Sequence, residues 1–302
     1  MACTHVGLHV ETALATVCTT GAALVAYAID GADVVAPGPA GPCRPEQYRG
    51  VVLAPWPNRV GGAAFVHDGV RYVLPVSEPA TGSSLHGLVS GRRWDVTGKS
   101  PAEVTLTYVL GGDPGYPFPI ELTARYRLTA DGLDVAVVAR NAGPRSAPVG
   151  LGAHPYLTAG ASVDETALHV PAVTVAEPGD RGLPARRHDV AGSPLDHRTP
   201  RVIGDARLDH AFTGLAADPD GRARVRLIGN ERTVVVELGP SVRWVMVFTA
   251  DTLEPPARRA SVAIEPMTCP PDALRTGEDP VVLPPGGSLA LEYSLRVESS
   301  AG

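Results

Sequence analysis

The chain has 302 residues, of which 44% are hydrophobic and 19% are charged, and its formal net charge is −6. This apolar content is enough for a sizeable core and excludes an intrinsically disordered protein. The acidic balance and the lack of any Lys/Arg run argue against nucleic acid as a partner, because a phosphate backbone is bound by clustered cations. No apolar stretch reaches the length of a membrane-spanning helix, so we expect no membrane partner.

The N-terminus and the cysteines indicate the compartment. Residues 1–5 contain neither the basic nor the apolar region of a signal peptide, which predicts a cytoplasmic protein. The four cysteines show no metal-type or redox-type C-x-x-C spacing. A domain of this size needs no disulfide bridges, so we expect free thiols in a reducing cytoplasm. The cysteines are Cys3, Cys18, Cys43 and Cys269.

Apolar and polar residues alternate with a period of two along most of the chain, which is typical of half-buried β-strands. Two hairpins are predicted, one over 65–74 that folds back at Asp68-Gly69, and one over 120–139 that turns at Ala130-Asp131-Gly132. No segment sustains a helical period beyond two or three turns. Further strands are predicted at 234–238, 242–249 and 289–297.

Thirty prolines and 33 glycines interrupt these strands at short intervals, as a sandwich of many strands requires. The stretch 177–207 is polar, rich in Pro, Gly and Arg, and has little periodicity. We interpret it as a long loop over one face of the sandwich rather than a linker between domains. The sequence therefore predicts an all-β protein, a large antiparallel β-sandwich in which residues 1–302 form a single domain.

Three short polar clusters carry the chemistry. Ser84-Leu85-His86-Gly87, Gly152-Ala153-His154-Pro155-Tyr156 and Ala263-Ile264-Glu265-Pro266 each place a proton-handling side chain beside a residue that bends or loosens the backbone. Environment can bring the pKa values of both His and Glu close to neutrality. Brought together, two histidines and a glutamate would form an acid/base pair suited to a polyhydroxylated substrate.

Each of these residues also has a purely structural interpretation. In that interpretation, either histidine bonds a backbone carbonyl, and Glu265 is a strand-end carboxylate paired with Arg258 or Arg259. Asp209, in a further cluster, then caps a turn, and Arg59 is an ordinary surface cation.

Two histidines and two acids also match a divalent metal site of the kind found in cupin-type sandwiches. Metal sites of that type place two ligands two residues apart on one strand, whereas here every candidate stands on its own segment. We therefore expect no metal. A serine nucleophile elbow and a Gly-rich phosphate loop are both absent from the sequence.

Six short motifs follow one another along the chain. They are, in order, Pro55-Trp56-Pro57-Asn58-Arg59, Leu85-His86-Gly87, His154-Pro155-Tyr156, Asp209-His210-Ala211-Phe212, Glu265-Pro266 and Leu283-Pro284-Pro285-Gly286. This order resembles the aldose 1-epimerase (galactose mutarotase) family, in the form found in its bacterial branch, and the resemblance extends from about Leu53 to Val297.

This resemblance implies a galactose mutarotase-like supersandwich with a sugar cleft, no cofactor, and an isomerase that interconverts the anomers of a free aldohexose. The position that matches Glu265 takes the proton of the anomeric hydroxyl, and the position that matches His154 protonates the ring oxygen. We expect these two side chains to face each other across a space about one pyranose wide. The implied sugar-binding residues are Arg59, His86, Asp209, Asn58 and Tyr156.

Many family members carry Gln two residues after the catalytic Glu, where this chain has Met267, so a preference for galactose is not implied. Three alternatives stay open: an enzyme of the same scaffold recruited to another proton transfer, a glycosidase that uses Asp209 and Glu265 as paired carboxylates, and a non-catalytic sugar-binding module. The partner expected is a small-molecule sugar, phosphorylated or not, and the expected oligomeric state is a monomer or a homodimer.

Overall fold

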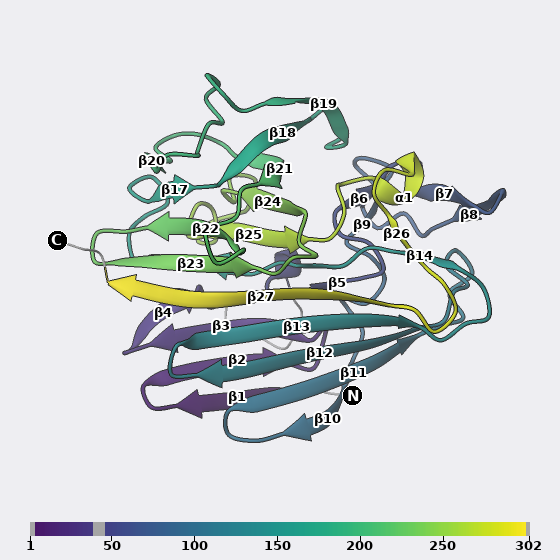
Figure 1. The fold of residues 1–302 in the computed structure, drawn as a ribbon, viewed down its shortest axis with the longest axis horizontal. Coiled ribbons are helices and arrows are strands. Elements are labelled where there is room, and N and C mark those ends of the chain that lie inside the picture. Colours follow the sequence, from purple (N-terminus) through teal and green to yellow (C-terminus); the bar gives the residue numbers. More distant parts are fainter. Residues whose placement is uncertain (1–3, 39–45, 300–302) are drawn as a thin grey trace.

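The computed structural model describes residues 4–38 and 46–299, and their regular structure is almost entirely β-strand. Two large antiparallel sheets pack face to face, and smaller two-stranded sheets lie at one end with the short helix α1 (Figure 1). The predicted all-β sandwich is confirmed. Both large sheets contribute side chains to the same hydrophobic core, among them Val6 and Leu8 from one and Leu122 and Ala124 from the other. That residues 1–302 form one domain stays a prediction.

The first sheet contains twelve strands within the described residues, and ten of them form a continuous path. In spatial order these are β1 (His5–Val10), β2 (Ala13–Cys18), β3 (Ala23–Ile29), β4 (Ala32–Val35), β16 (Tyr156–Leu157), β25 (Val262–Met267), β24 (Trp244–Phe248), β21 (Asp209–Leu215), β18 (Ala172–Pro178) and β19 (Pro184–Asp189). Beside this path, β15 (Gly152–Ala153) pairs with β25 and with β5 (Val52–Leu53).

The second sheet contains nine strands of the described chain. In spatial order they are β10 (Asp95–Lys99), β11 (Glu103–Leu110), β12 (Ile120–Thr129), β13 (Gly132–Asn141), β27 (Ser288–Ser299), β23 (Arg232–Leu238), β22 (Ala223–Ile228), β17 (Ala167–His169) and β20 (Arg201–Val202). The remaining elements are the pairs β14 (Ala147–Val149) with β26 (Val281–Leu283), β6 (Arg59–Val60) with β9 (Ser84–Leu85) and β7 (Ala64–His67) with β8 (Val70–Val73), the 3-10 turns η1 (Glu46–Tyr48) and η2 (Gly61–Ala63), and α1 (Ala273–Thr276).

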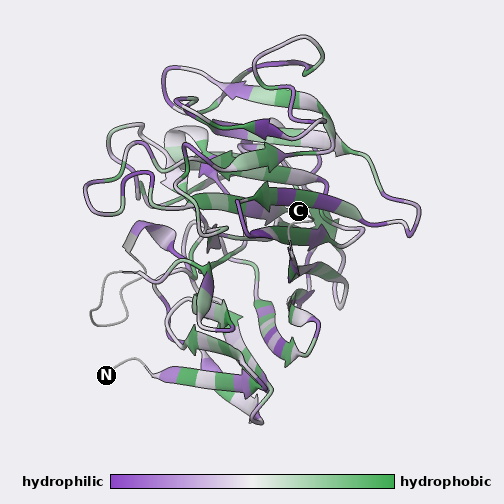
Figure 2. Ribbon diagram, turned by 90° about the vertical axis from the view of Figure 1, so that its left-hand side faces the viewer, coloured by the Kyte–Doolittle hydropathy of each residue, from purple (hydrophilic) through white to green (hydrophobic). Residues whose placement is uncertain are grey.

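The period-two pattern works because one face of each strand enters the core and the other does not. In β12, Leu122 and Tyr126 are buried while Glu121 and Arg125 face outward. The banding of hydropathy along the strands is visible in Figure 2. The predicted hairpin over 120–139 is confirmed, with Thr129 opposite Gly132. The other predicted strands are confirmed as β7 with β8, β23, β24 and β27.

The interpretation of 177–207 as one long loop is wrong in part. Residues 177–189 of this stretch contain the end of β18 and all of β19, which pair as a hairpin, and β20 follows later. Most of β19 is exposed because it is the edge strand of its sheet. An edge strand that buries no apolar face needs no apolar alternation, so its sequence carries no period-two signal.

Cys18 and Cys269 are free and buried, as predicted, whereas Cys3 and Cys43 lie outside the described residues. Within the described chain, no helix has the length and apolarity needed to cross a membrane.

Candidate active site

The pairing of β25 places its glutamate opposite a histidine. Gly152 of β15 pairs with Met267, and Tyr156 of β16 pairs with Ala263. Both pairs belong to the same register, and this register places His154 opposite Glu265. Pro155 has no backbone N–H, so the ladder is interrupted here and two short strands, β15 and β16, form in place of one.

Both backbone hydrogen-bonding groups of His154 are held by the segment just before β5. Gly50 donates its N–H to the carbonyl of His154 at 2.8 Å, and the N–H of His154 donates to the carbonyl of Val51 at 3.1 Å. Gly50 has a φ of +70°, and a Cβ there would lie 2.0 Å from the carbonyl oxygen of Leu24. Only glycine allows this approach.

The two side chains touch. Nε2 of His154 lies 3.3 Å from Oε1 of Glu265, and the two side chains are 5% and 3% exposed. They do face each other, but the expected space of one pyranose between them is wrong. The reason is the register, since His154 and Glu265 stand opposite each other on neighbouring segments and side chains of opposite residues begin only about 5 Å apart.

Burial shifts the pKa values of the pair in opposite directions. Desolvation raises the pKa of the Glu265 carboxyl well above its ordinary value, and the charge of Asp209 adds to this while that of Arg59 opposes it. Desolvation lowers the pKa of the His154 imidazole to about 3. Each shift favours the uncharged form. Burial therefore favours a pair in which both groups are uncharged, with Nε2 of the imidazole within reach of the carboxyl oxygen.

His86 presents a hydrogen-bond donor beside His154 and Glu265. The backbone N–H of Asn58 donates to Nδ1 of the His86 ring at 3.2 Å, and the backbone N–H of His86 donates to the carbonyl of Asn58 at 2.9 Å. Burial, followed by the charges of His154 and Arg59, lowers the pKa of His86 well below its ordinary value. The ring is therefore neutral, and because Nδ1 accepts, the proton is on Nε2. The side chain of Asn58 is itself occupied, since its Oδ1 accepts the N–H of Arg59 at 2.8 Å.

His86, His154 and Glu265 each bring one metal-ligating atom within 4.8 Å of the others. Sequence spacing could not reveal this convergence, because the three stand on separate segments. A metal needs a free lone pair on each imidazole. On His86 one lone pair accepts the Asn58 N–H and the other nitrogen carries the proton, so ligation would break the Asn58 bond. The cluster fits a hydrogen-bonding substrate better than a metal ion.

Arg59 and Asp209 complete the charged part of the site. Asp209 pairs with Phe248, which pairs in turn with Ala263, two residues from Glu265 and on the same face of the sheet. The charge of Arg59 acts on both carboxyls. Burial raises the pKa of Asp209, against the lowering effect of Arg59. The structure thus brings both predicted acids together on one face of the sheet, within range of the charge of the predicted cation.

Three aromatic or cationic groups surround the histidines. The ring of Tyr156 is buried and stacks on His154 at 5.0 Å between centroids. The guanidinium of Arg49 lies 4.2 Å from the Tyr156 ring centroid. The ring of Tyr48 lies 4.6 Å from that of His86. Sequence reasoning missed Tyr48 and Arg49, because the non-periodic segment around them contains no motif.

The structural interpretations of Glu265 are not supported. Arg259 forms its ion pairs with Asp164 and Asp251, at 2.6 and 2.8 Å, and no ion pair joins Glu265 to Arg258 in the described chain. Asp209 is the first residue of β21, not a turn cap.

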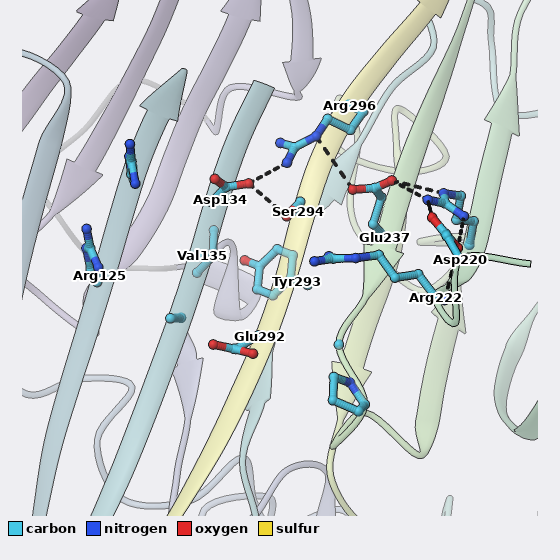
Figure 3. Close-up of a pocket in the computed structure, with 15 residues that line it drawn as sticks. Arg125, Asp134, Val135, Asp220, Arg222, Glu237, Glu292, Tyr293, Ser294 and Arg296 are labelled. Atoms are coloured by element: carbon cyan, nitrogen blue, oxygen red, sulfur yellow. Dashed lines mark hydrogen bonds and ion pairs between the residues drawn. The ribbon is translucent and has the colours of Figure 1, made fainter. Parts of the chain in front are cut away.

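A separate hollow of about 550 Å³ lies on the outer face of the nine-stranded sheet (Figure 3). There Arg296 pairs with Asp134 and Arg224 pairs with Glu237. It contains none of the predicted site residues.

Comparison with known proteins agrees with this arrangement. The aldose 1-epimerase family model matches residues 7–296. The chain belongs to the aldose 1-epimerase family. It is therefore an enzyme of an isomerase family, as its motifs predicted.

Among curated relatives of this family, the uncharacterized protein YihR of Escherichia coli is 32% identical over 287 residues, covering 93% of this chain and 89% of that protein. The aldose 1-epimerase of the same organism is 27% identical over 197 residues, covering 58% of this chain and 55% of that protein.

Solved structures share the fold. A GalM/aldose epimerase homologue from C. elegans has a TM-score of 0.87 at 17% identity, covering 99% of this chain and 100% of the other. A putative aldose 1-epimerase from Escherichia coli has a TM-score of 0.84 at 23% identity, covering 98% and 99%. A galactose 1-epimerase from Lactobacillus acidophilus has a TM-score of 0.83 at 19% identity, covering 99% and 95%.

Proposed function

We propose that this protein is a mutarotase that interconverts the α and β anomers of a free aldohexose. The observation that carries the proposal is the 3.3 Å contact between His154 and Glu265, both buried, in a member of the aldose 1-epimerase family. Opening a hemiacetal requires one group that removes a proton while another delivers one. A neutral pair that shares a single proton can do both.

In this mechanism Glu265 takes the proton of the O1 hydroxyl while His154 gives a proton to the ring oxygen O5. The C1–O5 bond breaks and a C1=O1 double bond forms. The aldehyde rotates about C1–C2, and closure on the other face reverses the two transfers. His154 must carry the shared proton when the sugar is bound. The proton therefore moves from Glu265 to His154 across their contact as the polar substrate enters.

The remaining side chains hold the sugar. Arg59 and His86 donate to hydroxyl oxygens, and Asp209 accepts from hydroxyl hydrogens. Both kinds of contact suit a substrate that presents only hydroxyl groups. The chain's own side chains supply every step of this mechanism, so we propose that no cofactor takes part.

We propose no preference for galactose over glucose, because Met267 offers no hydrogen bond where many relatives carry Gln. Free thiols at Cys18 and Cys269 agree with a cytoplasmic enzyme. The proposed oligomeric state is a monomer or a homodimer.

Polarimetry tests the proposal. Fresh α-glucose and α-galactose should relax to their equilibrium rotation faster with the protein than without it, and a panel of aldoses identifies the substrate. The Glu265→Gln variant, prepared in the same way, is the control for contaminating mutarotase. If the wild type accelerates no free aldose, the recruited-enzyme alternative replaces this proposal.

A further inference from the structure

The guanidinium of Arg59 is held by two segments that lie far from it in sequence. One is the loop between β8 and β9, which contains Glu78, and the other is the turn between β18 and β19, which contains Gly182. Neither residue belongs to the motifs that identify the family here. Glu78 holds Arg59 by short, charge-assisted hydrogen bonds, and Gly182 by a longer one and by close packing.

Glu78 binds Arg59 through two parallel hydrogen bonds. Nε of Arg59 lies 2.7 Å from Oε2 of Glu78, and Nη2 lies 2.8 Å from Oε1. The two side chains are only 16% and 21% exposed, so water screens this pair less than a surface ion pair. A bidentate pair fixes the plane of the guanidinium as well as its position.

Glu78 is itself rigidly placed. The hydroxyl of Thr81 donates to its Oε2 at 2.5 Å, the N–H of Gly82 donates to its backbone carbonyl, and its own N–H donates to the carbonyl of Ser83. Burial alone would raise the pKa of Glu78. The hydrogen bonds from Arg59 and Thr81 more than offset this, and the pKa is lowered. The carboxylate therefore stays charged.

Gly182 closes the other side of the guanidinium. Its carbonyl accepts from Nη1 of Arg59 at 3.4 Å. Its φ is +67°, and a Cβ at this position would lie 2.8 Å from both Cζ and Nη1 of Arg59. Leu183, the next residue, packs closely on Gly61. A Cβ added at Gly61 would lie 2.7 Å from Cδ1 of Leu183. The tip of the β18–β19 hairpin is thus seated against the strand that carries Arg59.

We propose that Glu78 and Gly182 are positioning residues that orient Arg59 for sugar binding and so determine substrate affinity. The inference rests on the proposed function, in which Arg59 holds a sugar hydroxyl. A guanidinium has five N–H groups, and Glu78 and Gly182 together occupy three of them. The other two are fixed in direction before the sugar arrives, so less conformational entropy is lost on binding.

The test measures two quantities, KM for mutarotation and the calorimetric Kd of a 1,5-anhydrohexitol, which lacks the anomeric hydroxyl and cannot react. Glu78→Gln should raise both by roughly 10-fold, the value of one weakened charge-assisted hydrogen bond, with kcat little changed. The matched control is Glu121→Gln, which removes a surface partner of Arg140 and should change neither quantity. Melting temperature is measured for every variant.

Combination with Arg59→Ala separates positioning from general structural damage. If Glu78 acts through Arg59, the double variant should bind no more weakly than Arg59→Ala alone. If the losses add, or if Glu78→Gln leaves KM and Kd unchanged, the proposal is wrong.

Gly182→Ala tests the second contact and should also raise KM and Kd. Its control is Gly192→Ala, because Gly192 has a similar φ of +71° but nothing within 4 Å of the new Cβ. Equal effects of the two substitutions would reject a specific role for Gly182. A wild type that binds the anhydrohexitol but catalyses nothing overturns the mutarotase function while leaving the positioning role to be judged from Kd. A wild type that neither binds nor catalyses overturns both.

Discussion

His154 contacts Glu265 at a point where the backbone ladder between their strands is broken, at Pro155. Intact pairing on either side holds the two side chains in register, and at Pro155 itself only one bond remains, from the N–H of Ile264 to the Pro155 carbonyl. The backbone pairings at Gly152 and Tyr156 therefore position the acid/base pair, although His154 itself lies between the two strands.

Removing either member of this pair should abolish most of the turnover. Glu265→Gln keeps the size of the side chain but cannot accept a proton, and His154→Asn cannot deliver one. We expect kcat to fall by roughly 10²–10⁴ in each case with KM little changed, measured by polarimetry on glucose and galactose. Wild-type relaxation rates for either sugar with Glu265→Gln would reject the mechanism.

The pH profile should lack the acid limb of an ordinary histidine. The pKa of His154 is lowered to about 3, so the free enzyme does not take up a second proton as the pH falls through 6.5. The raised pKa of Glu265 keeps the one required proton on the pair. We expect kcat/KM to stay level from pH 7 down to about 5, after subtraction of spontaneous mutarotation. An apparent pKa near 6.5 would contradict this assignment.

Arg59→Ala should act mainly on binding, because Arg59 holds the sugar and transfers no proton. We expect KM to rise by roughly 10- to 100-fold, as for the loss of a charge-assisted hydrogen bond, while kcat changes far less. Initial rates over a range of sugar concentrations measure both constants. A fall in kcat at constant KM would move Arg59 from binding to catalysis.

Chelation should leave activity intact. The ring proton on Nε2 of His86 and its bond from Asn58 disfavour metal binding between the two histidines. Dialysis against EDTA, followed by polarimetry and metal analysis, tests this. Lost activity that zinc or manganese restores would favour the cupin-type alternative.

Gly50→Ala should destabilise the protein through both its φ and its new Cβ. A non-glycine residue at positive φ costs about 1–3 kcal/mol in strain, and the Cβ would also meet the carbonyl of Leu24. The control is Gly62→Ala, at a φ of +65° with nothing within 4 Å. Thermal denaturation should show a larger loss of stability for Gly50→Ala. Equal losses would show that the close approach to Leu24 is unimportant.

Sequence patterns predict those parts of the fold where one face of a strand is packed. The alternation from Ile120 to Ala139 fixes a hairpin because every second residue enters the core. In β19 no apolar side chain enters the core, because the strand is mostly exposed and its packed contacts come from polar residues such as Arg187 on Trp244, and the pattern therefore contains no trace of a strand. The prediction of a loop there failed for the same physical reason that the hairpin succeeded.

The candidate site divides in a similar way. Its histidines, Arg59 and the two acids stand in short motifs whose order could be recognised. Glu78 could not be predicted, because its importance comes from a contact with Arg59 that no local pattern encodes. The direct contact of His154 with Glu265 was also missed, since it depends on the register of β25.

Strand β25 has a further consequence. Ile264 faces the main core while its neighbour Glu265 faces His154, so the strand serves packing and chemistry on alternate residues. A shift of one residue would exchange the two faces, placing a carboxyl in the core and an isoleucine beside the imidazole. A single residue inserted into or deleted from β25 would therefore disturb the core and the acid/base pair at the same time.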